Sequence, residues 1–449
     1  MKLKKILIGL GLMMSANCFA VFPGGGVREL VIQPNRRTKN EHKRVNDLLE
    51  NTRVYTIGGG IPDSDSVRQM ITTFYEDQYR HAHDPLAPYF MFMSKDARIA
   101  MGVGGVVRMR GWFDWTNAIG ANGFAPYLIE IPKNPAHNRR VGGTPSGTDI
   151  YFTIFGRNTP LGNWQGFIEA NFNGYAGLGL KLKKAYFSVG DWTAGYTTST
   201  FSDPAAEPPT IDGAGPNGVM SRTSLLVRYL KSIKNKWMFG GAIEMPQANY
   251  NVDGVNTEKC YDFIPDIIAT GQYQWDYGVS HVRLSAMVRS LPYRNLVEGK
   301  NCNLAGWGVT ASSTVKITNP LGLYGIITYG RGYGSYSGDL SCDQLDLMGV
   351  PGKPGELYAP YAISAVFGAK YNILSNLYIG VALSELRNFT KAGTDPSAYK
   401  YGLYGAANIF WDIMPRLQVG LEYLAGKRMN VGGEHGNSNR VDAMFQLSF

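Results

Sequence analysis

Apolar side chains recur at every second residue through most of this chain, from Ile99 to Phe449. The alternation is clearest in residues 103–115, 282–289 and 440–449. Side chains of a β-strand point to opposite faces in turn, so a period of two predicts strands with one apolar face. Segment after segment repeats this face, and the sequence supplies no second apolar face for it to pack on. The pattern therefore favours strands surrounded by lipid over the packed sheets of a soluble sandwich.

Connections between these segments alternate between short and long. Long polar connections rich in Gly, Pro and Asp are expected at 116–148, 202–220, 249–266 and 334–359. Outer-membrane barrels alternate in this way, with short periplasmic turns and longer external loops. About sixteen antiparallel strands are therefore predicted within residues 96–449, enough to enclose a water-filled channel with both termini in the periplasm. The short turns are expected at 158–163, 190–191, 233–236, 276–278, 319–322, 372–376 and 412–416.

Aromatic residues near the predicted strand ends suit the two aromatic bands at the membrane interfaces, although ordinary sheet aromatics are the alternative. The terminal Phe449 lies on the same face as Leu447 and Phe445. This ending resembles the C-terminal signature that directs proteins through the barrel-assembly machinery into the bacterial outer membrane. The candidate interface residues are Trp112, Trp115, Trp164, Trp192, Trp237, Trp275, Tyr277 and Trp411.

The first twenty residues have the form of a signal peptide. Three lysines precede an apolar stretch, and small residues end it at Ala20, after which we expect cleavage. A lipoprotein site at Cys18 is the alternative, but Asn17 and Ser15 fit it poorly. Residues 21–95 are then expected to form a partly helical periplasmic segment. Apolar positions at helical spacing predict a helix at 64–81, and a weaker one is expected at 40–52.

Basic side chains dominate the face opposite the apolar one, which is expected to line the lumen. Arginine stays charged and presents several donors, so a row of such groups favours anions. The alternative is a structural ladder in which these cations pair with carboxylates on the same face and brace the wall. The basic set is Arg108, Arg110, Arg157, Lys181, Lys183, Arg222, Arg228, Arg283, Arg289 and Arg440, and the acidic set is Asp114, Glu169, Glu422 and Asp442.

The third external connection, 202–220, has the composition of a rigid constriction. It holds four prolines, and its glycines permit sharp turns. We expect it to fold inward, so that Asp203, Glu207 and Asp212 face the arginines and set up a transverse field. An ordinary outward loop is the alternative.

Three cysteines follow the signal peptide, and all are predicted in external loops. Cys260 is expected in the fourth loop, Cys302 in the fifth and Cys342 in the sixth. One disulfide between neighbouring loops is consistent with export, but the sequence leaves the pairing open.

A block within the barrel resembles the DcaP-like outer-membrane porin family. Residues 180–218 read LKLKKAYFSVGDWTAGYTTSTFSDPAAEPPTIDGAGPNG. The family carries a basic strand ending in an A-Y pair, a turn, a T/W-S-T-F strand, and a D-P…P…D…G-P-N-G loop. The matching positions are Lys181, Lys183, Lys184, Ala185 and Tyr186, then Ser199, Thr200, Phe201, Asp203 and Pro204, and later Asp212, Gly215, Pro216, Asn217 and Gly218.

The resemblance extends in layout over residues 99–449. It implies a trimeric, sixteen-stranded porin that takes up small anionic solutes such as dicarboxylates. Family members can carry a coiled-coil N-terminal segment, whereas residues 21–95 show no sustained heptads. The resemblance therefore implies trimer contacts through the barrel walls.

Two other classes of function compete with a channel. A structural or adhesive barrel would have a plugged lumen or lack a constriction loop. An outer-membrane hydrolase would need a nucleophile beside a base, but the six histidines show no recognisable motif. No cysteine or histidine spacing matches a zinc site, and the positive charge is too dispersed for a nucleic-acid patch. The sequence therefore predicts a passive, non-enzymatic channel without cofactor, metal or nucleic acid.

Overall fold

The computed structural model describes residues 28–30, 53–57, 66–67, 69–70, 90–172, 179–234, 236–275 and 280–449. The predicted signal peptide, the weaker helix at 40–52, and the turn at 276–278 with Tyr277 lie outside these residues. Of the helix predicted at 64–81, the four described residues are helical.

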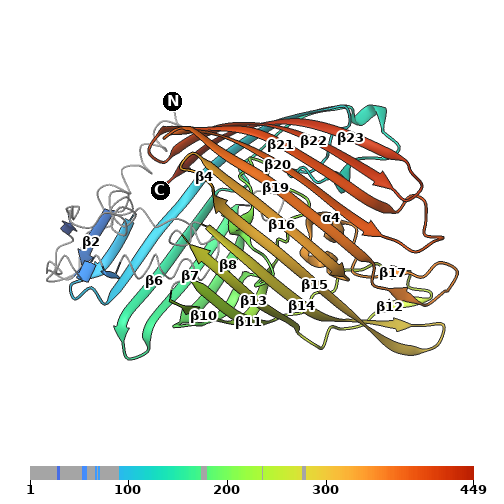
Figure 1. Ribbon diagram of the computed structural model, residues 1–449, viewed down its shortest axis with the longest axis horizontal. Helices are drawn as coiled ribbons and strands as arrows, with labels where there is room; N and C mark the ends of the chain where they lie inside the picture. The colour runs from blue at the N-terminus through green and yellow to red at the C-terminus, as the bar shows by residue number, and fades with distance from the viewer. Residues whose placement is uncertain are drawn as a thin grey trace.

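Sixteen antiparallel strands of the described chain form one closed barrel (Figure 1). Each strand pairs with the next along the chain, and the last strand, β23, pairs with the first, β4. Closure leaves no strand edge unpaired in lipid, so the predicted transmembrane β-barrel is confirmed. The strands are β4 (Ile99–Trp115), β6 (Asp149–Thr159), β7 (Gly162–Phe172), β8 (Leu180–Val189), β9 (Trp192–Thr198), β10 (Thr223–Ile233), β11 (Trp237–Glu244), β13 (Asp266–Trp275), β14 (Ser280–Asn295), β15 (Lys300–Lys316), β16 (Leu321–Arg331), β19 (Tyr361–Leu374), β20 (Leu377–Phe389), β21 (Tyr399–Met414), β22 (Leu417–Asn430) and β23 (His435–Ser448).

Exposure alternates along the strands as the sequence predicts. On β14, Val282 and Leu284 are 49% and 56% exposed, whereas Arg283 and Arg289 are each 4% exposed. The exposed apolar side chains form the outer surface of the barrel, and the polar ones point inward.

Several aromatic side chains lie exposed beside the short turns, as expected for an interface band. Trp192 packs on Tyr229 with ring centroids 4.9 Å apart, and Trp237 packs on Tyr273 at 4.6 Å. The prediction that Trp112 belongs to an interface band is wrong, because this side chain is buried and points into the barrel.

Short turns and longer loops alternate along the described chain. The loops used below are loop 1 (116–148), loop 3 (199–222), loop 4 (245–265) and loop 6 (332–360). Strands β14 and β15 are joined by residues 296–299 alone, so Cys302 lies within β15 and not in a loop. The two other cysteines lie in loops 4 and 6, and all three thiols are free.

The loops carry short elements of their own. Loop 1 contains η1 (Pro126–Leu128), η2 (Pro135–His137) and β5 (Arg139–Thr144), and loop 4 contains β12 (Thr257–Lys259). Loop 3 contains η4 (Pro204–Ala206), and loop 6 contains η6 (Gly334–Tyr336), α4 (Gly338–Cys342), β17 (Met348–Gly349) and β18 (Leu357–Tyr358).

A small sheet adjoins the barrel at the turn end of β4. Strand β3 (Phe90–Ser94) pairs antiparallel with residues 100–103 of β4, and β2 (Arg53–Ile57) pairs parallel with β3. Strand β1 (Arg28–Leu30) forms the outer edge of this sheet. The C-terminal Phe449 pairs with Gly105 of β4, so β23 and β3 follow each other along one edge of β4.

A separate apolar core packs this small sheet, with Val67, Met70, Met91, Met93 and Phe155 among its buried members. Among the described residues, no helix is long and apolar enough to span a membrane.

Candidate channel interior

Loop 3 begins against β14 and β15, the third and fourth strands of the barrel after β10. Arg283 Nη2 on β14 donates to Thr200 O at 2.7 Å. Asp203 Oδ2 lies 2.9 Å from His281 Nε2 on β14, and Ser312 on β15 donates to the same oxygen. Loop 3 connects β9 to β10, neither of which pairs with β14 or β15. Its first residues contact β11, through Glu244, as well as β14 and β15.

The next part of loop 3, with Pro208 and Pro209, lies along strands β19 to β21. A Cβ on Gly368 would lie 2.3 Å from Pro208 Cβ, so only glycine leaves room for the loop at this point. Asn408 Nδ2 on β21 donates to Pro209 O at 2.8 Å. Proline fixes its own φ, so this part of the loop is stiff as well as attached.

The tip of loop 3 is held by β22 and β4. The backbone N–H groups of Ile211 and Asp212 donate to the two carboxylate oxygens of Glu422, at 2.9 and 2.7 Å. Arg110 Nη1 lies 3.2 Å from Asp212 Oδ1, and Arg108 Nη2 donates to Ile211 O at 2.6 Å. The tip thus lies between Glu422 of β22 and the two arginines of β4, and these charged side chains hold it.

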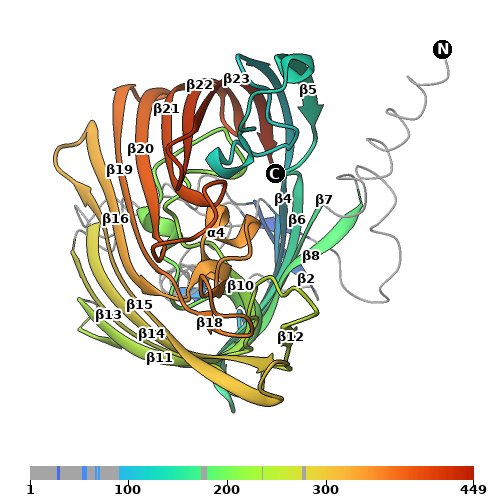
Figure 2. The ribbon, with the colours of Figure 1, turned by 90° about the vertical axis from the view of Figure 1, so that its right-hand side faces the viewer.

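The returning half of loop 3 follows the same wall. Gly218 N donates to Ser384 Oγ on β20 at 2.8 Å, and Ser364 Oγ on β19 donates to Gly218 O at 3.0 Å. Figure 2 shows the ring of strands with α4 and neighbouring loop segments inside it. Loop 3 therefore lies along the inner faces of the strands from β14 round to β4.

Asp212 is paired with Arg110, and the two other acidic residues of loop 3 differ in their surroundings. Burial alone would raise the pKa of the Asp203 carboxyl, but hydrogen bonds from His281 and Ser312 and the charge of Arg283 lower it to about 2. Burial, reinforced by Asp203, raises the pKa of Glu207 to about 8. Glu207 is half-buried, and no hydrogen bond or ion pair joins its carboxyl to another residue that the structure describes.

Arg440 on β23 is completely buried and saturated with partners. Its Nε and Nη2 donate to the two oxygens of Asp114 on β4, at 2.6 and 3.0 Å. The same guanidinium donates to the backbone carbonyls of Ile119, Ala121 and Asn122 in loop 1. Arg440 therefore closes the β4–β23 seam and attaches loop 1 to it.

A second buried cluster joins β13, β14 and loop 6. Asp266 accepts from Arg222 at 3.2 Å and lies 3.4 Å from Arg289 Nε, while Arg289 Nη1 lies 3.1 Å from Asp346 Oδ1. Tyr336 Oη donates to Asp266 at 2.8 Å, and the Arg222 guanidinium lies 4.3 Å from the Tyr336 ring centroid. These arginines hold loop 6 to the wall.

The remaining predicted basic residues divide by exposure. Lys183 is half-buried and donates to Asp149 and Glu169, both at 2.8 Å. Lys181, two residues earlier on β8, is exposed. Arg228 is buried and its Nη1 lies 3.5 Å from Thr198 O. Arg157 contacts Gln69 and Ser66 O beside the small sheet, away from loop 3.

The basic and acidic residues predicted for the lumen are thus brought together mainly as pairs. Arg110 also lies 3.6 Å from Asp442. Arg110, Arg222, Arg283, Arg289 and Arg440 are all 6% exposed or less. For these five arginines the structure matches the bracing alternative, because their charges are met by carboxylates and carbonyls.

Arg140 on β5 is a basic residue that the sequence reasoning did not select. It lies opposite Asp114 in the β4–β5 ladder, so its side chain points to the same inner face. Both oxygens of Asp114 already accept from Arg440. Arg140 is exposed, and within the described part of the chain its guanidinium has no hydrogen-bond or ion-pair partner. The clue was the alternation in 139–144, which was hidden by treating 116–148 as one loop.

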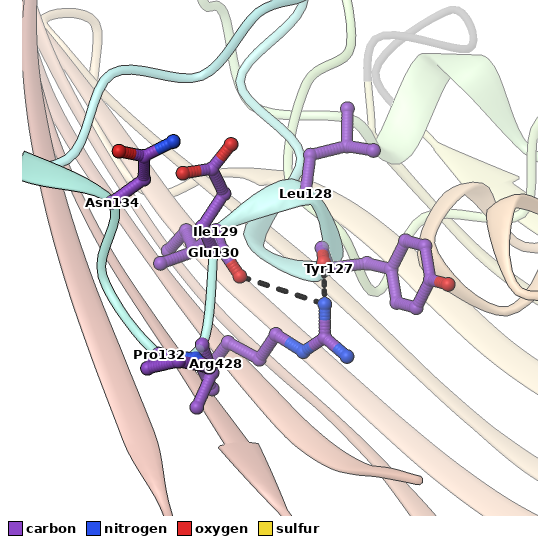
Figure 3. A pocket seen from close by; sticks show the side chains of 8 residues that line it. Tyr127, Leu128, Ile129, Glu130, Pro132, Asn134 and Arg428 are labelled. Atoms are coloured by element: carbon purple, nitrogen blue, oxygen red, sulfur yellow. Dashed lines mark hydrogen bonds between the residues drawn. The ribbon is translucent and has the colours of Figure 1, made fainter. Parts of the chain in front are cut away.

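A pocket of about 450 Å³ lies between loop 1 and β22 (Figure 3). Arg428 Nη1 donates to Tyr127 O at 2.6 Å, and its guanidinium lies 4.7 Å from the Tyr127 ring centroid. The pocket is thus bordered by an arginine that already holds loop 1. No group of three or more potential metal ligands occurs among the described residues.

Comparison with solved structures shows which known barrels share this fold. The outer membrane channel DcaP of Acinetobacter baumannii matches with a TM-score of 0.69 at 20% identity, covering 79% of this chain and 98% of that chain. The fold is that of the porins. The anion-selective porin from Comamonas acidovorans matches this porin fold with a TM-score of 0.51 at 11% identity, over 78% of this chain and 100% of that chain. No family model and no curated protein matches the sequence.

The predicted resemblance to DcaP-like porins is thereby confirmed at the level of the fold. The alternation of apolar side chains and the lengths of the connections predict this barrel. The solved structures share the fold although their sequence identity to this chain is low.

Proposed function

We propose that this protein is an outer-membrane porin, a passive channel for small hydrophilic anionic solutes such as dicarboxylates. The observation that carries the proposal is a closed sixteen-stranded barrel with loop 3 bound along its inner wall. Barrels of this size enclose water, whereas eight strands would be filled by their own side chains. A stiff loop inside the ring narrows the path and limits the size of solute.

Exposed basic residues on the inner face support anion preference. Arg140 and Lys181 are exposed, and Arg440 already neutralises Asp114 beside Arg140. Uncompensated positive charge lowers the barrier for anions and raises it for cations. The bound loop 3 then acts as the constriction, and the proposal involves no catalytic step and no cofactor.

The same proposal places the protein in the bacterial outer membrane as a homotrimer. The barrel offers an apolar outer face to lipid, and the solved structures that share its fold include an outer membrane channel and an anion-selective porin. We propose that Phe449 is recognised by the barrel-assembly machinery, and that residues 21–95 form a periplasmic segment. Release of the signal peptide after Ala20 would precede assembly.

Conductance in planar bilayers under a salt gradient tests the proposal directly. We expect discrete channels with a reversal potential displaced toward the anion equilibrium potential. Cation preference would contradict the solute class. The absence of channels from properly folded barrels would favour the structural or adhesive alternative.

Neutralising Arg140 should weaken anion preference. An unpaired charge 4 Å from a passing ion in water contributes about 1 kcal/mol, which corresponds to about a fivefold change in local anion concentration. We expect Arg140→Gln to lower the anion-to-cation permeability ratio measured from reversal potentials at about 0.1 M salt, where screening is moderate. Arg139→Gln is the matched control, because Arg139 lies opposite Trp115 and points to the outer face. Equal effects of the two substitutions would remove Arg140 from the selectivity argument.

Selectivity should also depend on Glu207 at alkaline pH. With its pKa raised to about 8, Glu207 is largely protonated at neutral pH and gains a negative charge as the pH rises through 8. We expect the anion preference of the wild type to fall between about pH 7 and pH 9. Glu207→Gln should abolish that fall, and a persistent fall in this variant would assign the titration to another group.

A further inference from the structure

Three external loops meet at one buried carboxylate in α4. Asp339 Oδ2 accepts from Asn217 Nδ2 in loop 3 at 2.9 Å and from Tyr399 Oη on β21 at 2.8 Å. The backbone N–H of Tyr127 in loop 1 donates to Asp339 Oδ1 at 3.4 Å. Asp339 itself belongs to loop 6 and is 1% exposed. One side chain therefore joins loops 1, 3 and 6 to each other and to the barrel wall.

The space around this carboxylate is tightly filled. A Cβ on Gly402 would lie 2.6 Å from Tyr399 Oη and 2.9 Å from both Asn217 Nδ2 and Asp339 Oδ2. Glycine is therefore needed at this position of β21 for the side chains of Asn217, Asp339 and Tyr399 to meet.

Further contacts join the same loops around Asp339. Ser221 N donates to Tyr336 O at 2.9 Å, and Met220 forms a β-bridge with Ser337. Tyr127 Oη donates to Asp343 at 2.7 Å, and Arg428 holds the carbonyl of Tyr127. The junction thus lies at the centre of a connected group of loop contacts.

We propose that Asp339 is the latch of an extracellular lid, and that gain or loss of its proton shifts loops 1, 3 and 6 between a closed and a released arrangement. The inference rests on the proposed channel function, since the lid would control the current through the barrel. A carboxylate suits this role because its oxygens can accept from several loops at once.

The direction of the pH effect follows from linkage. Burial raises the pKa of Asp339 to about 6, although hydrogen bonds from Asn217, Tyr399 and Tyr127 and the charge of Arg428 oppose the rise. In the released arrangement the carboxyl would regain water and a pKa near 4. The closed arrangement therefore binds the proton more tightly, so acid favours closure. A difference of about two pKa units changes the equilibrium between the arrangements by up to about a hundredfold.

Other titratable groups also face this carboxyl. Tyr399 comes from β21, Tyr127 from loop 1 and Arg428 from β22, while Cys342 ends α4 and Asp343 follows it. Burial also raises the pKa of Asp343. Its loss of a proton at rising pH would add negative charge beside Asp339 and act in the same direction.

Single-channel recording between pH 5 and pH 7.5 tests the latch with two opposite substitutions. We expect the wild-type mean current to be low at pH 5 and to rise toward pH 7.5. Asp339→Asn is neutral like the protonated acid and keeps one acceptor oxygen, so its current should stay low at both pH values. Asp339→Ala removes every acceptor and should give a high current at both. An Asp339→Asn channel with wild-type pH dependence would overturn the proposal.

Hydrogen–deuterium exchange of the folded barrel in detergent provides a readout that does not depend on conductance. We expect Asp339→Ala and Tyr399→Phe to speed exchange together in peptides from loops 1, 3 and 6. Tyr404→Phe is the matched control, because it removes a buried hydroxyl of the same strand that has no hydrogen-bond partner among the described residues. Unchanged exchange in both latch variants would contradict the latch. A wild type that forms no channels would contradict the proposed function, and the exchange result would still decide for or against the latch.

Discussion

Replacing Arg440 with methionine is expected to destabilise the folded barrel by about 3–5 kcal/mol, because the change leaves the buried carboxylate of Asp114 without its counter-charge. The substitution also removes the Arg440 donors from three loop 1 carbonyls, of which, among the described residues, only that of Asn122 keeps a second donor, Arg110. Both side chains are completely shielded from water, so solvent cannot compensate. Urea-induced unfolding of the refolded protein in detergent, followed by tryptophan fluorescence, measures the loss.

Arg387→Met is the matched control for this prediction. Arg387 pairs with Glu385 at 2.7 Å, but on the outer face, where both side chains are about two-fifths exposed. An exposed pair of this kind contributes about 0–1 kcal/mol. If Arg440→Met costs no more than Arg387→Met, the seam does not depend on the buried pair.

Glu422→Ala should release the tip of loop 3 and increase the single-channel conductance. The carboxylate accepts two backbone N–H groups of the loop and the side-chain amide of Asn408. A buried donor left without a partner costs about 1–3 kcal/mol, so the bound tip becomes much less favourable. We expect a larger conductance and more current noise than in the wild type. Noise analysis of single channels measures both.

Two variants make this result interpretable. Glu422→Gln keeps one acceptor oxygen and should lie between the wild type and Glu422→Ala. Glu385→Ala removes a carboxylate from the outer face of the neighbouring wall and should leave the conductance unchanged. A wild-type conductance in Glu422→Ala would show that the loop tip does not limit the current.

Much of the fold was readable from the sequence because lipid and water impose opposite demands on alternate residues. Val282 and Leu284 had to face outward once their neighbours were Arg283 and Ser285, so strand phase was fixed locally. Turn positions such as 190–191 and 233–236 follow from local residue preferences. Sixteen strands and closure follow from these two signals together, with no knowledge of long-range contacts.

Which inward-facing charged residues pair with each other was harder to predict, because pairing depends on contacts between residues far apart in the chain. Arg110 and Asp212 are about a hundred residues apart, and nothing in either local sequence predicts their pairing. Arg440 was predicted as a lumen charge but is fully occupied by Asp114 and loop 1. Arg140 was overlooked because a short strand inside loop 1 was hidden by its polar surroundings. Alternation predicts which face a side chain occupies, but not whether a loop covers it.

The arrangement at the turn end of β4 limits how the protein can be labelled. Phe449 pairs with Gly105, and β3 already occupies residues 100–103 on the same edge. An affinity tag fused after Phe449 would compete with β3 for that edge or have to leave the sheet at once. The exposed connection at 296–299, which joins two long strands on the opposite rim, offers a site for an epitope insertion that disturbs neither the seam nor the small sheet.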